Sequence, residues 1–394
     1  MATMTKTALR CSAPQPALAE TLKLAAGFAG GGKDNSTAMY CAVLSAGDDG
    51  GLTVSATNGR TWCALRVDGA SVATPGQVAV NARLLAEVTA QLPPDTVELD
   101  LDAGERRLNV RCGRSEAHMG TQDVGLWPPA PAIKAPHDRV TVDAEALTAA
   151  LGRVRFAVST DESRAILTGM LWELTGGGFD GEAVAPSTLT LAAADGFRLA
   201  VQRLPVDADG AWRRVIPGKV LTDVARLLGA QKGPVNVLFS EKHVRFDLVA
   251  WAVTAELVVG VFPNYAQLIP KSWTGRATMN TEALAAAART AAVFADSSGP
   301  LRVWSDPAGM MLPPELHLSC ARDDNHGAAG VEATTEGEPI RIAFTARYFR
   351  QAVEAAGGKR VVLETTSPSA PAVLRCEGDD HWQAVLMPLF VTWE

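Results

Sequence analysis

The sequence lacks a long hydrophobic run and paired cysteines. No apolar stretch approaches the roughly 20 residues that cross a bilayer, and residues 1–16 contain no apolar segment of the signal-peptide type. The six cysteines are scattered, and none forms a Cys-x-x-Cys pair. This spacing argues against a disulfide framework and for reduced thiols. We therefore expect a cytoplasmic protein with no membrane partner.

Basic residues are in the minority. There are 36 Lys and Arg against 43 Asp and Glu, and the net charge is −7 at pH 7. This balance argues against a surface coated in cations, but it leaves room for a basic face confined to one side of the molecule.

The sequence also lacks a recognisable metal or catalytic set. Cys320 and His326 are too isolated for a metal site, which needs three or four ligands. Four further histidines have no paired nucleophile beside them: His118, His243, His317 and His381. No cofactor is expected.

One stretch, GFAGGGKDN at 27–35, matches the phosphate-binding pattern Gly-x-x-x-x-Gly-Lys. A true phosphate loop follows a strand and has Ser or Thr after the lysine. Here the apolar spacing from Leu18 to Phe28 indicates a preceding helix, and Asp34 follows Lys33. We interpret the glycines as a helix stop. An ATP-hydrolysing enzyme is the alternative, and ATP turnover with and without Lys33→Ala would test it.

A chain of 394 residues exceeds what one hydrophobic core organises, and internal repetition indicates how it divides. A helical segment follows a short apolar strand in VAVNARLLAEVTAQL from Val78, VIPGKVLTDVARLL from Val215 and IAFTARYFRQAVEAA from Ile342. Asn81 and Thr345 can accept bonds from the first free amides, and Pro217 suits a helix start. The segments recur about 130 residues apart.

A second helical segment recurs in the same rhythm, from Ala17, Glu145 and Glu282. Strand-like segments with alternating apolar residues accompany both helices and suit antiparallel sheets with one covered face. We therefore predict an α+β chain of three repeated units, each with antiparallel sheets and two helices. The predicted domains are 1–135, 136–272 and 273–394.

The helical segments carry Lys and Arg opposite their apolar stripe. Lys219 and Arg226 are seven residues apart and share a face of one helix. The predicted basic face comprises Lys23, Arg83, Arg153, Lys219, Arg226, Arg289, Arg347 and Arg350. A solvated helix surface is the alternative. Repetition of this face in an acidic protein favours a surface for a polyanion.

Several motifs resemble the bacterial DNA polymerase III beta sliding clamp family. The chain reads AAADGFRLAV at 192–201, where the family has ATDGHRLA, and IPGK at 216–219 opens a helix as it does in the family. FPNYAQLIP at 262–270 is similar to the family's F-P-x-Y-x-x-x-I-P, and VLMPL at 385–389 is similar to its V-M-P-M. The resemblance covers the middle and last thirds well, and the first third mainly in layout.

The resemblance implies three DNA-clamp domains per chain and two chains closed head to tail into a ring, with sheets outside and helices lining a hole. It implies a non-catalytic processivity factor for DNA replication that encircles double-stranded DNA without reading its sequence. The basic face would line the hole, and Lys33 and Arg164 hold the places of family DNA contacts. The implied partners are the DNA polymerase III alpha subunit, the clamp loader and other clamp-binding-motif proteins, in the cytoplasm at the nucleoid.

The resemblance further implies a pocket between the second and third domains for a short peptide of these partners. Its residues would be Leu167, Ala194, Gly196, Phe197, Arg198, Leu199, Leu268, Thr345, Tyr348, Val385, Leu386, Met387, Pro388 and Leu389. Apolar walls of this kind receive Leu or Phe anchors. The alternative is that these residues only pack the domain junction.

Three pocket positions depart from the family: Phe197 replaces His, Thr345 replaces Asn and Leu389 replaces Met. Residues 390–394 also continue past the family's common end. We predict a pocket altered in selectivity but still usable. The departures raise an alternative function, a specialised extra clamp copy that tolerates clamp-binding inhibitors.

For ring closure, the resemblance implies that Val293 and Phe294 of one copy pack against Ala117 and Met119 of the next. Ala117 stands where the family often has an aromatic residue. This loss of bulk predicts a weaker homodimer contact.

Overall fold

The structure is a computed structural model that describes residues 9–31, 37–102, 104, 106–133, 138–176, 186–229, 231–295, 299–306 and 314–393. It divides into two compact units, 1–142 with 233–257 and 143–232 with 258–394. Each unit takes part of the middle third, so the three domain ranges inferred from sequence stay a prediction. The first of their boundaries, at residue 135, lies outside the described residues.

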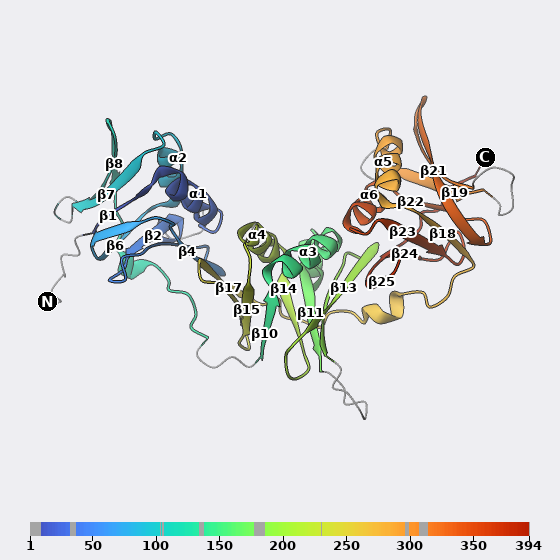
Figure 1. The fold of residues 1–394 in the computed structure, drawn as a ribbon, viewed down its shortest axis with the longest axis horizontal. Helices are drawn as coiled ribbons and strands as arrows, with labels where there is room; N and C mark the ends of the chain where they lie inside the picture. The colour runs from blue at the N-terminus through green and yellow to red at the C-terminus, as the bar shows by residue number, and fades with distance from the viewer. Residues whose placement is uncertain are drawn as a thin grey trace. The chain divides into compact units, whose positions relative to one another are not determined.

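The first unit packs a helix pair with antiparallel sheets (Figure 1). Its elements are β1 (Arg10–Pro14), α1 (Gln15–Ala26), η1 (Thr37–Tyr40), β2 (Cys41–Ala46), β3 (Leu52–Thr57), β4 (Thr61–Arg66), β5 (Ser71–Thr74), β6 (Gly76–Asn81), α2 (Ala82–Ala90), β7 (Thr96–Asp102), β8 (Arg107–Cys112), β9 (Ser115–Gly120), η2 (Val124–Leu126), β10 (Asp138–Asp143), β15 (Pro234–Phe239), β16 (His243–Asp247) and β17 (Trp251–Glu256). The strand orders are β5-β1-β7-β8-β9 and β10-β15-β16-β17-β4-β3-β2-β6. Strand β4 pairs with β17, Cys63 opposite Val253, so one sheet joins the first and middle thirds.

The second unit has the same kind of architecture with two helix pairs, α3 with α4 and α5 with α6. Its elements are α3 (Ala144–Val154), η3 (Arg155–Ala157), η4 (Glu162–Thr168), β11 (Gly169–Thr175), β12 (Ser187–Ala194), β13 (Arg198–Val206), β14 (Trp212–Pro217), α4 (Gly218–Leu228), η5 (Tyr265–Leu268), β18 (Gly275–Asn280), α5 (Thr281–Ala292), β19 (Pro300–Ser305), β20 (Glu315–Arg322), β21 (Asn325–Gly337), β22 (Arg341–Thr345), α6 (Ala346–Ala355), β23 (Arg360–Thr365), β24 (Ala372–Cys376) and β25 (Asp379–Leu386). The strand order is β14-β11-β12-β13-β25-β24-β23-β18-β21-β20-β19-β22. The β13–β25 pairing joins the middle third to the last third.

The predicted repetition of two helices in each third is confirmed. Strand–helix steps occur at β1–α1, β10–α3 and β18–α5, and again at β6–α2, β14–α4 and β22–α6. Asn81 caps α2 by accepting a bond from the Leu84 amide at 2.9 Å, as its residue type predicts. Thr345 directly precedes α6, but its side chain accepts no bond from the helix amides. Pro217 directly precedes α4 and likewise makes no side-chain cap bond.

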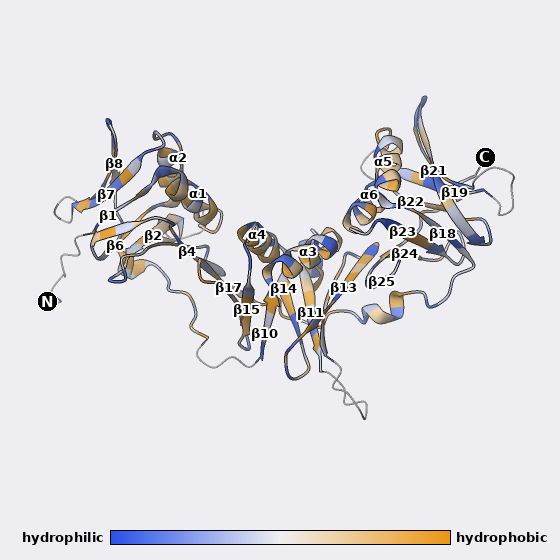
Figure 2. Ribbon diagram, viewed as in Figure 1, coloured by the Kyte–Doolittle hydropathy of each residue, from blue (hydrophilic) through white to orange (hydrophobic). Residues whose placement is uncertain are grey.

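The helices are amphipathic, which explains their packing (Figure 2). On α4, Val220, Leu221 and Val224 are buried, whereas Lys219 and Arg226 are exposed. Burial of such an apolar stripe stabilises a helix more than its intrinsic propensity does. None of the described helices combines the length and apolar character that crossing a bilayer requires.

Candidate functional site

A tight turn between β12 and β13 carries the centre of the predicted pocket. Gly196 adopts a φ of +95°, a left-handed value that favours glycine, and a Cβ there would lie 2.8 Å from Arg164 Nη1. The carboxylate of Asp195 accepts bonds from the amides of Phe197 and Arg198 at 2.9 and 3.0 Å. Glycine and aspartate together therefore shape the backbone that presents Phe197.

Arg198 is buried beside this turn and is an anchor rather than a free cation. Its Nε donates to Asp195 Oδ2 at 2.9 Å, and its Nη1 donates to Gln351 Oε1 on α6 at 2.5 Å. Its guanidinium also lies 4.2 Å from the ring centre of Tyr348. Burial lowers the pKa of Arg198, and the charge of Asp195 opposes that shift. The cluster ties the turn of the middle third to α6 of the last third.

An apolar cluster next to the turn includes residues predicted for the pocket, and we call it the apolar floor. Its buried members are Leu167, Leu171, Ala192, Ala194, Leu199, Val201, Val215, Phe262 and Val385. Leu199 on β13 stands directly opposite Val385 on β25. The structure thus brings together four residues predicted for the pocket from distant parts of the chain: Leu167, Ala194, Leu199 and Val385. Leu386 lies instead in the core of the last third, because successive side chains of a strand point to opposite faces.

Tyr265 on η5 is partly buried against the floor and donates its hydroxyl to Glu173 at 2.8 Å. Burial, together with this bond, raises the pKa of Tyr265 to about 12. The phenol therefore stays neutral throughout the physiological range.

Several large apolar side chains of the predicted pocket are exposed to solvent. Phe197 is 55% exposed, Leu268 is 53% exposed and Met387 is 46% exposed. The Met387 amide donates to the Phe197 carbonyl at 2.9 Å, so these two residues are neighbours. Phe197 and Tyr348 place their ring centres 6.2 Å apart. Large apolar groups left open beside a buried apolar cluster are typical of a binding surface.

The other predicted pocket residues lie around the strand β22 and the segment after β25. Pro388 and Leu389 are half-buried, and the Leu389 amide donates to the Ala343 carbonyl at 2.8 Å. Thr345 is half-buried at the end of β22, opposite Pro300.

The turn also borders a cleft of about 750 Å³ between η3 and α6. Aromatic side chains line it at Phe156, Phe197 and Tyr348. Charged side chains line it as well: Arg155, Asp161, Arg164, Asp195, Arg198, Arg347 and Glu354. Arg164, a predicted DNA contact, donates to the carbonyl of Asp195 at 3.0 Å, which places it at this cleft. The cleft can therefore hold a peptide segment that has both apolar and polar groups.

The predicted basic face is only partly made of exposed, unpaired cations. Lys23, Arg83, Lys219, Arg226, Arg289 and Arg347 are exposed on their helices, but Lys219 and Arg226 both pair with Asp223. Arg289 pairs with Glu354 at 3.4 Å, Arg350 is half-buried, and Arg153 pairs with Asp379 at 3.0 Å. Lys33 lies outside the described residues.

Asp223 on α4 is a functional candidate that sequence reasoning missed. Its side chain is largely buried and accepts from Lys219 Nζ at 3.2 Å and from Arg226 Nη1 at 3.3 Å. It lies four residues after Lys219 and three before Arg226, a helical spacing that could have revealed it. One carboxylate therefore offsets two cations of the predicted basic face.

The predicted ring-closing residues lie at two separate places. Ala117 and Met119 are on β9, an edge strand in the described part of its sheet; Ala117 is half-buried and Met119 is buried. Val293, just after α5, is 73% exposed. Phe294 packs against Gly327 of β21, where a Cβ would contact its ring. Of these four residues, Val293 has the most exposed side chain and is therefore the most accessible to a second copy of the chain.

The described residues contain no group of three or more His, Cys, Asp and Glu side chains able to hold a metal ion. The six cysteines are buried and form no disulfide. Burial raises the pKa of Cys11 and of Cys320 to about 11, which keeps both as thiols.

Comparisons with known proteins point to one family over nearly the whole chain. Residues 17–131, 141–264 and 266–390 match the models of the N-terminal, central and C-terminal domains of the DNA polymerase III beta subunit. The chain is 29% identical over 328 residues to a beta sliding clamp of Caulobacter vibrioides, covering 82% of this chain and 84% of that protein. It is 31% identical over 269 residues to one of Micrococcus luteus, covering 66% of this chain and 81% of that protein.

Solved structures agree. The sliding clamp of Bacillus subtilis superposes with a TM-score of 0.85 at 22% identity, over 98% of this chain and all of that one, which shows a common fold. A beta sliding clamp of Caulobacter crescentus superposes with a TM-score of 0.83 at 26% identity, over 98% of this chain and all of that one. That crystal contains polyethylene glycol in a region assigned to beta-motif tethering.

Proposed function

We propose a function for this chain from one premise. The chain belongs to the DNA polymerase III beta subunit family, the beta sliding clamps. It is a three-domain sliding clamp, a non-catalytic processivity factor of DNA replication. Two copies close head to tail around duplex DNA and tether a polymerase by enclosure. The observation that supports this proposal best is the match of all three clamp domains in order along one chain.

The clamp must hold DNA and still slide, so its DNA contacts have to be weak and blind to sequence. Lys and Arg facing phosphates supply such contacts, because phosphates carry no sequence information. The exposed cations on the helices suit this role: Lys23, Arg83, Lys219, Arg226 and Arg347. Lys33 and Arg164 remain predicted contacts on the family pattern.

Asp223→Asn is expected to strengthen DNA binding. The substitution keeps the shape of the side chain but removes the charge that holds Lys219 and Arg226. Each cation released toward a phosphate should steepen the plot of log affinity against log salt by about one. Fluorescence anisotropy with a labelled duplex across a salt series measures this slope.

Asp100→Asn is the matched control, since Asp100 lies on strand β7 and the substitution makes the same charge change beside Arg10 of β1. An unchanged slope for Asp223→Asn, or equal slopes for the two variants, would contradict the role assigned to the α4 cations.

The apolar floor and its exposed neighbours form the proposed partner site. A short peptide from the polymerase alpha subunit, the clamp loader or another clamp-binding protein inserts Leu or Phe anchors over Leu199 and Val385. Phe197 and Met387 border the site. Tethering through such a peptide raises the local concentration of polymerase at the template.

Phe197→Ala is expected to weaken binding of a labelled peptide with Leu and Phe anchors by about tenfold, while the melting temperature stays nearly constant. An exposed aromatic that borders a pocket behaves as a binding hot spot, and its truncation leaves no buried cavity. Fluorescence polarisation measures the affinity and thermal unfolding measures the stability. Val259→Ala, at an apolar residue that is 93% exposed, should change neither. A Phe197→Ala variant that binds the peptide as tightly as the parent would remove Phe197 from the site.

The homodimer, the named partners and the cytoplasmic location remain proposals that the family supports. The specialised inhibitor-tolerant copy stays a prediction, tested by comparing inhibitor affinity for this clamp with that for another clamp of the same cell.

A further inference from the structure

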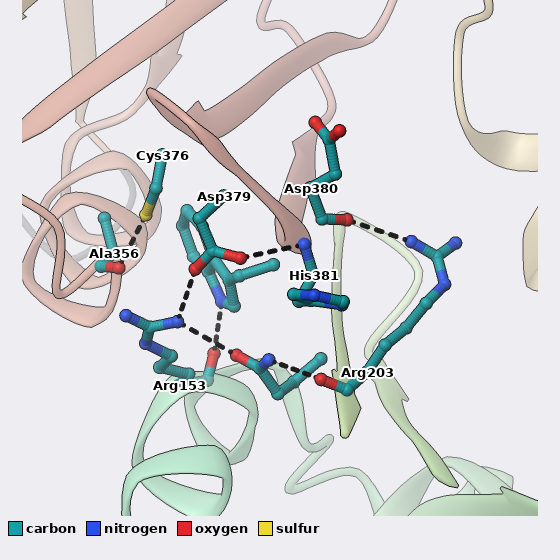
Figure 3. Close-up of polar contacts among 9 residues, drawn as sticks. Arg153, Arg203, Ala356, Cys376, Asp379, Asp380 and His381 are labelled. Carbon is teal, nitrogen blue, oxygen red and sulfur yellow. Dashed lines mark hydrogen bonds and ion pairs between the residues drawn. The ribbon is translucent and has the colours of Figure 1, made fainter. Parts of the chain in front are cut away.

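We call the β13–β25 pairing the seam. A polar cluster lies at one end of it, and Arg153 of α3 makes bonds to both strands there (Figure 3). Arg153 Nη1 donates to Asp379 Oδ2 at 3.0 Å and to Gln202 Oε1 at 3.2 Å. The Arg153 carbonyl accepts a bond from Trp382 Nε1 at 3.0 Å. Arg153 thus binds both strands of the seam at once.

The surroundings enclose this guanidinium. The Arg153 side chain is 24% exposed and that of Asp379 is 30% exposed. Arg153 also lies over Gly357, whose φ is +70° and where a Cβ would stand 2.9 Å from Nη2. A guanidinium that is covered and already paired makes a poor contact for a passing phosphate.

Further bonds connect the same cluster. The His381 amide donates to Asp379 Oδ1 at 2.9 Å, and Arg203 Nη1 donates to the Asp380 carbonyl at 3.2 Å (Figure 3). Gln202 Nε2 donates to the Arg203 carbonyl at 2.9 Å. These bonds fix the start of β25 against β13.

The seam leads from this cluster to the peptide site. Gln202 pairs with Trp382 at the cluster end, and Leu199 pairs with Val385 at the floor of the pocket. The step from Gln202 to Leu199 is roughly 10 Å along a strand that rises about 3.3 Å per residue. A shift of β25 at the cluster would therefore displace one wall of the pocket relative to the other.

We propose that Arg153, through Asp379, is a positioning residue for the peptide site and not a DNA contact. The inference rests on the proposed function of that site. Without the Arg153–Asp379 pair, β13 and β25 sample misaligned arrangements. The apparent affinity for the peptide then falls in proportion to the fraction of protein molecules whose strands stay aligned for binding.

Arg153→Met and Asp379→Asn test this proposal because the two roles predict different results. Positioning predicts that each variant weakens binding of the labelled Leu/Phe peptide by about fivefold, and that the double variant is no weaker than either single one. It also predicts no change in the salt dependence of duplex binding. A DNA contact at Arg153 predicts instead a slope shallower by about 0.9 for Arg153→Met and no loss of peptide affinity for either variant.

Val303→Ala, in the core of the last third, is the control for general destabilisation. It should lower the melting temperature without changing peptide affinity. Equal peptide loss in Val303→Ala, or full peptide affinity in Asp379→Asn, would overturn the proposal. Failure of the parent protein to bind the peptide would instead refute the proposed partner site, so the two failures are distinguishable.

Discussion

Asp195→Ala is expected to lower the free energy of unfolding by about 3–5 kcal/mol, the typical loss when one partner of a buried ion pair is removed. The Arg198 and Asp195 side chains are 7% and 11% exposed, and the Asp195 carboxylate also accepts the amides of Phe197 and Arg198. The substitution leaves a buried guanidinium without its counter-charge and removes both turn bonds. Chemical denaturation followed by tryptophan fluorescence measures the loss.

Asp100→Ala is the control, because its pair with Arg10 is more exposed, at 31% and 68%, and should contribute far less. Comparable losses for the two variants would contradict the anchoring role of Arg198. The same Asp195→Ala protein should also lose peptide affinity, since the turn presents Phe197.

Val293→Arg is expected to convert the proposed ring into single chains. Val293 is 73% exposed, so an arginine there has no folded core to disturb. In a closed ring, however, the new charge would enter an apolar contact at each of two symmetric junctions without a partner. We expect dimer affinity to fall by at least about 100-fold, which corresponds to roughly 3 kcal/mol.

The measurement is mass in solution by light scattering. The parent protein should have about twice 41.4 kDa and the variant about 41.4 kDa. Val249→Arg is the matched control: Val249 is also an exposed valine, outside the predicted junction, and its variant should remain a dimer. A dimeric Val293→Arg protein would place the junction elsewhere.

Much of the fold could be predicted because its signals are local. Helical spacing, a capping residue such as Asn81 and the recurrence of whole segments all lie within short stretches of sequence. The strand pairings that join the thirds, β4 with β17 and β13 with β25, were not predicted. Pairing between distant strands leaves no mark in either strand's own pattern.

The candidate site was predictable where motif and geometry coincide, as for Leu199 and Val385. The charged residues were harder. Arg153 occupies a helical surface position by its spacing, but its partner Asp379 is 226 residues away, and only the folded chain brings them together. Asp223 shows the converse: its partners lie within one helical turn, yet counting cations alone overlooks it.

Retention on DNA circles tests the central claim, enclosure, most directly. A clamp loaded onto a nicked circular duplex in the presence of its loader should stay bound for many minutes at moderate salt, and it should slide off once a restriction enzyme linearises the circle. The Val293→Arg variant should dissociate quickly from both the circular and the linear duplex. A parent protein that dissociates from both forms at the same rate, or that remains on the linear duplex, would contradict the account.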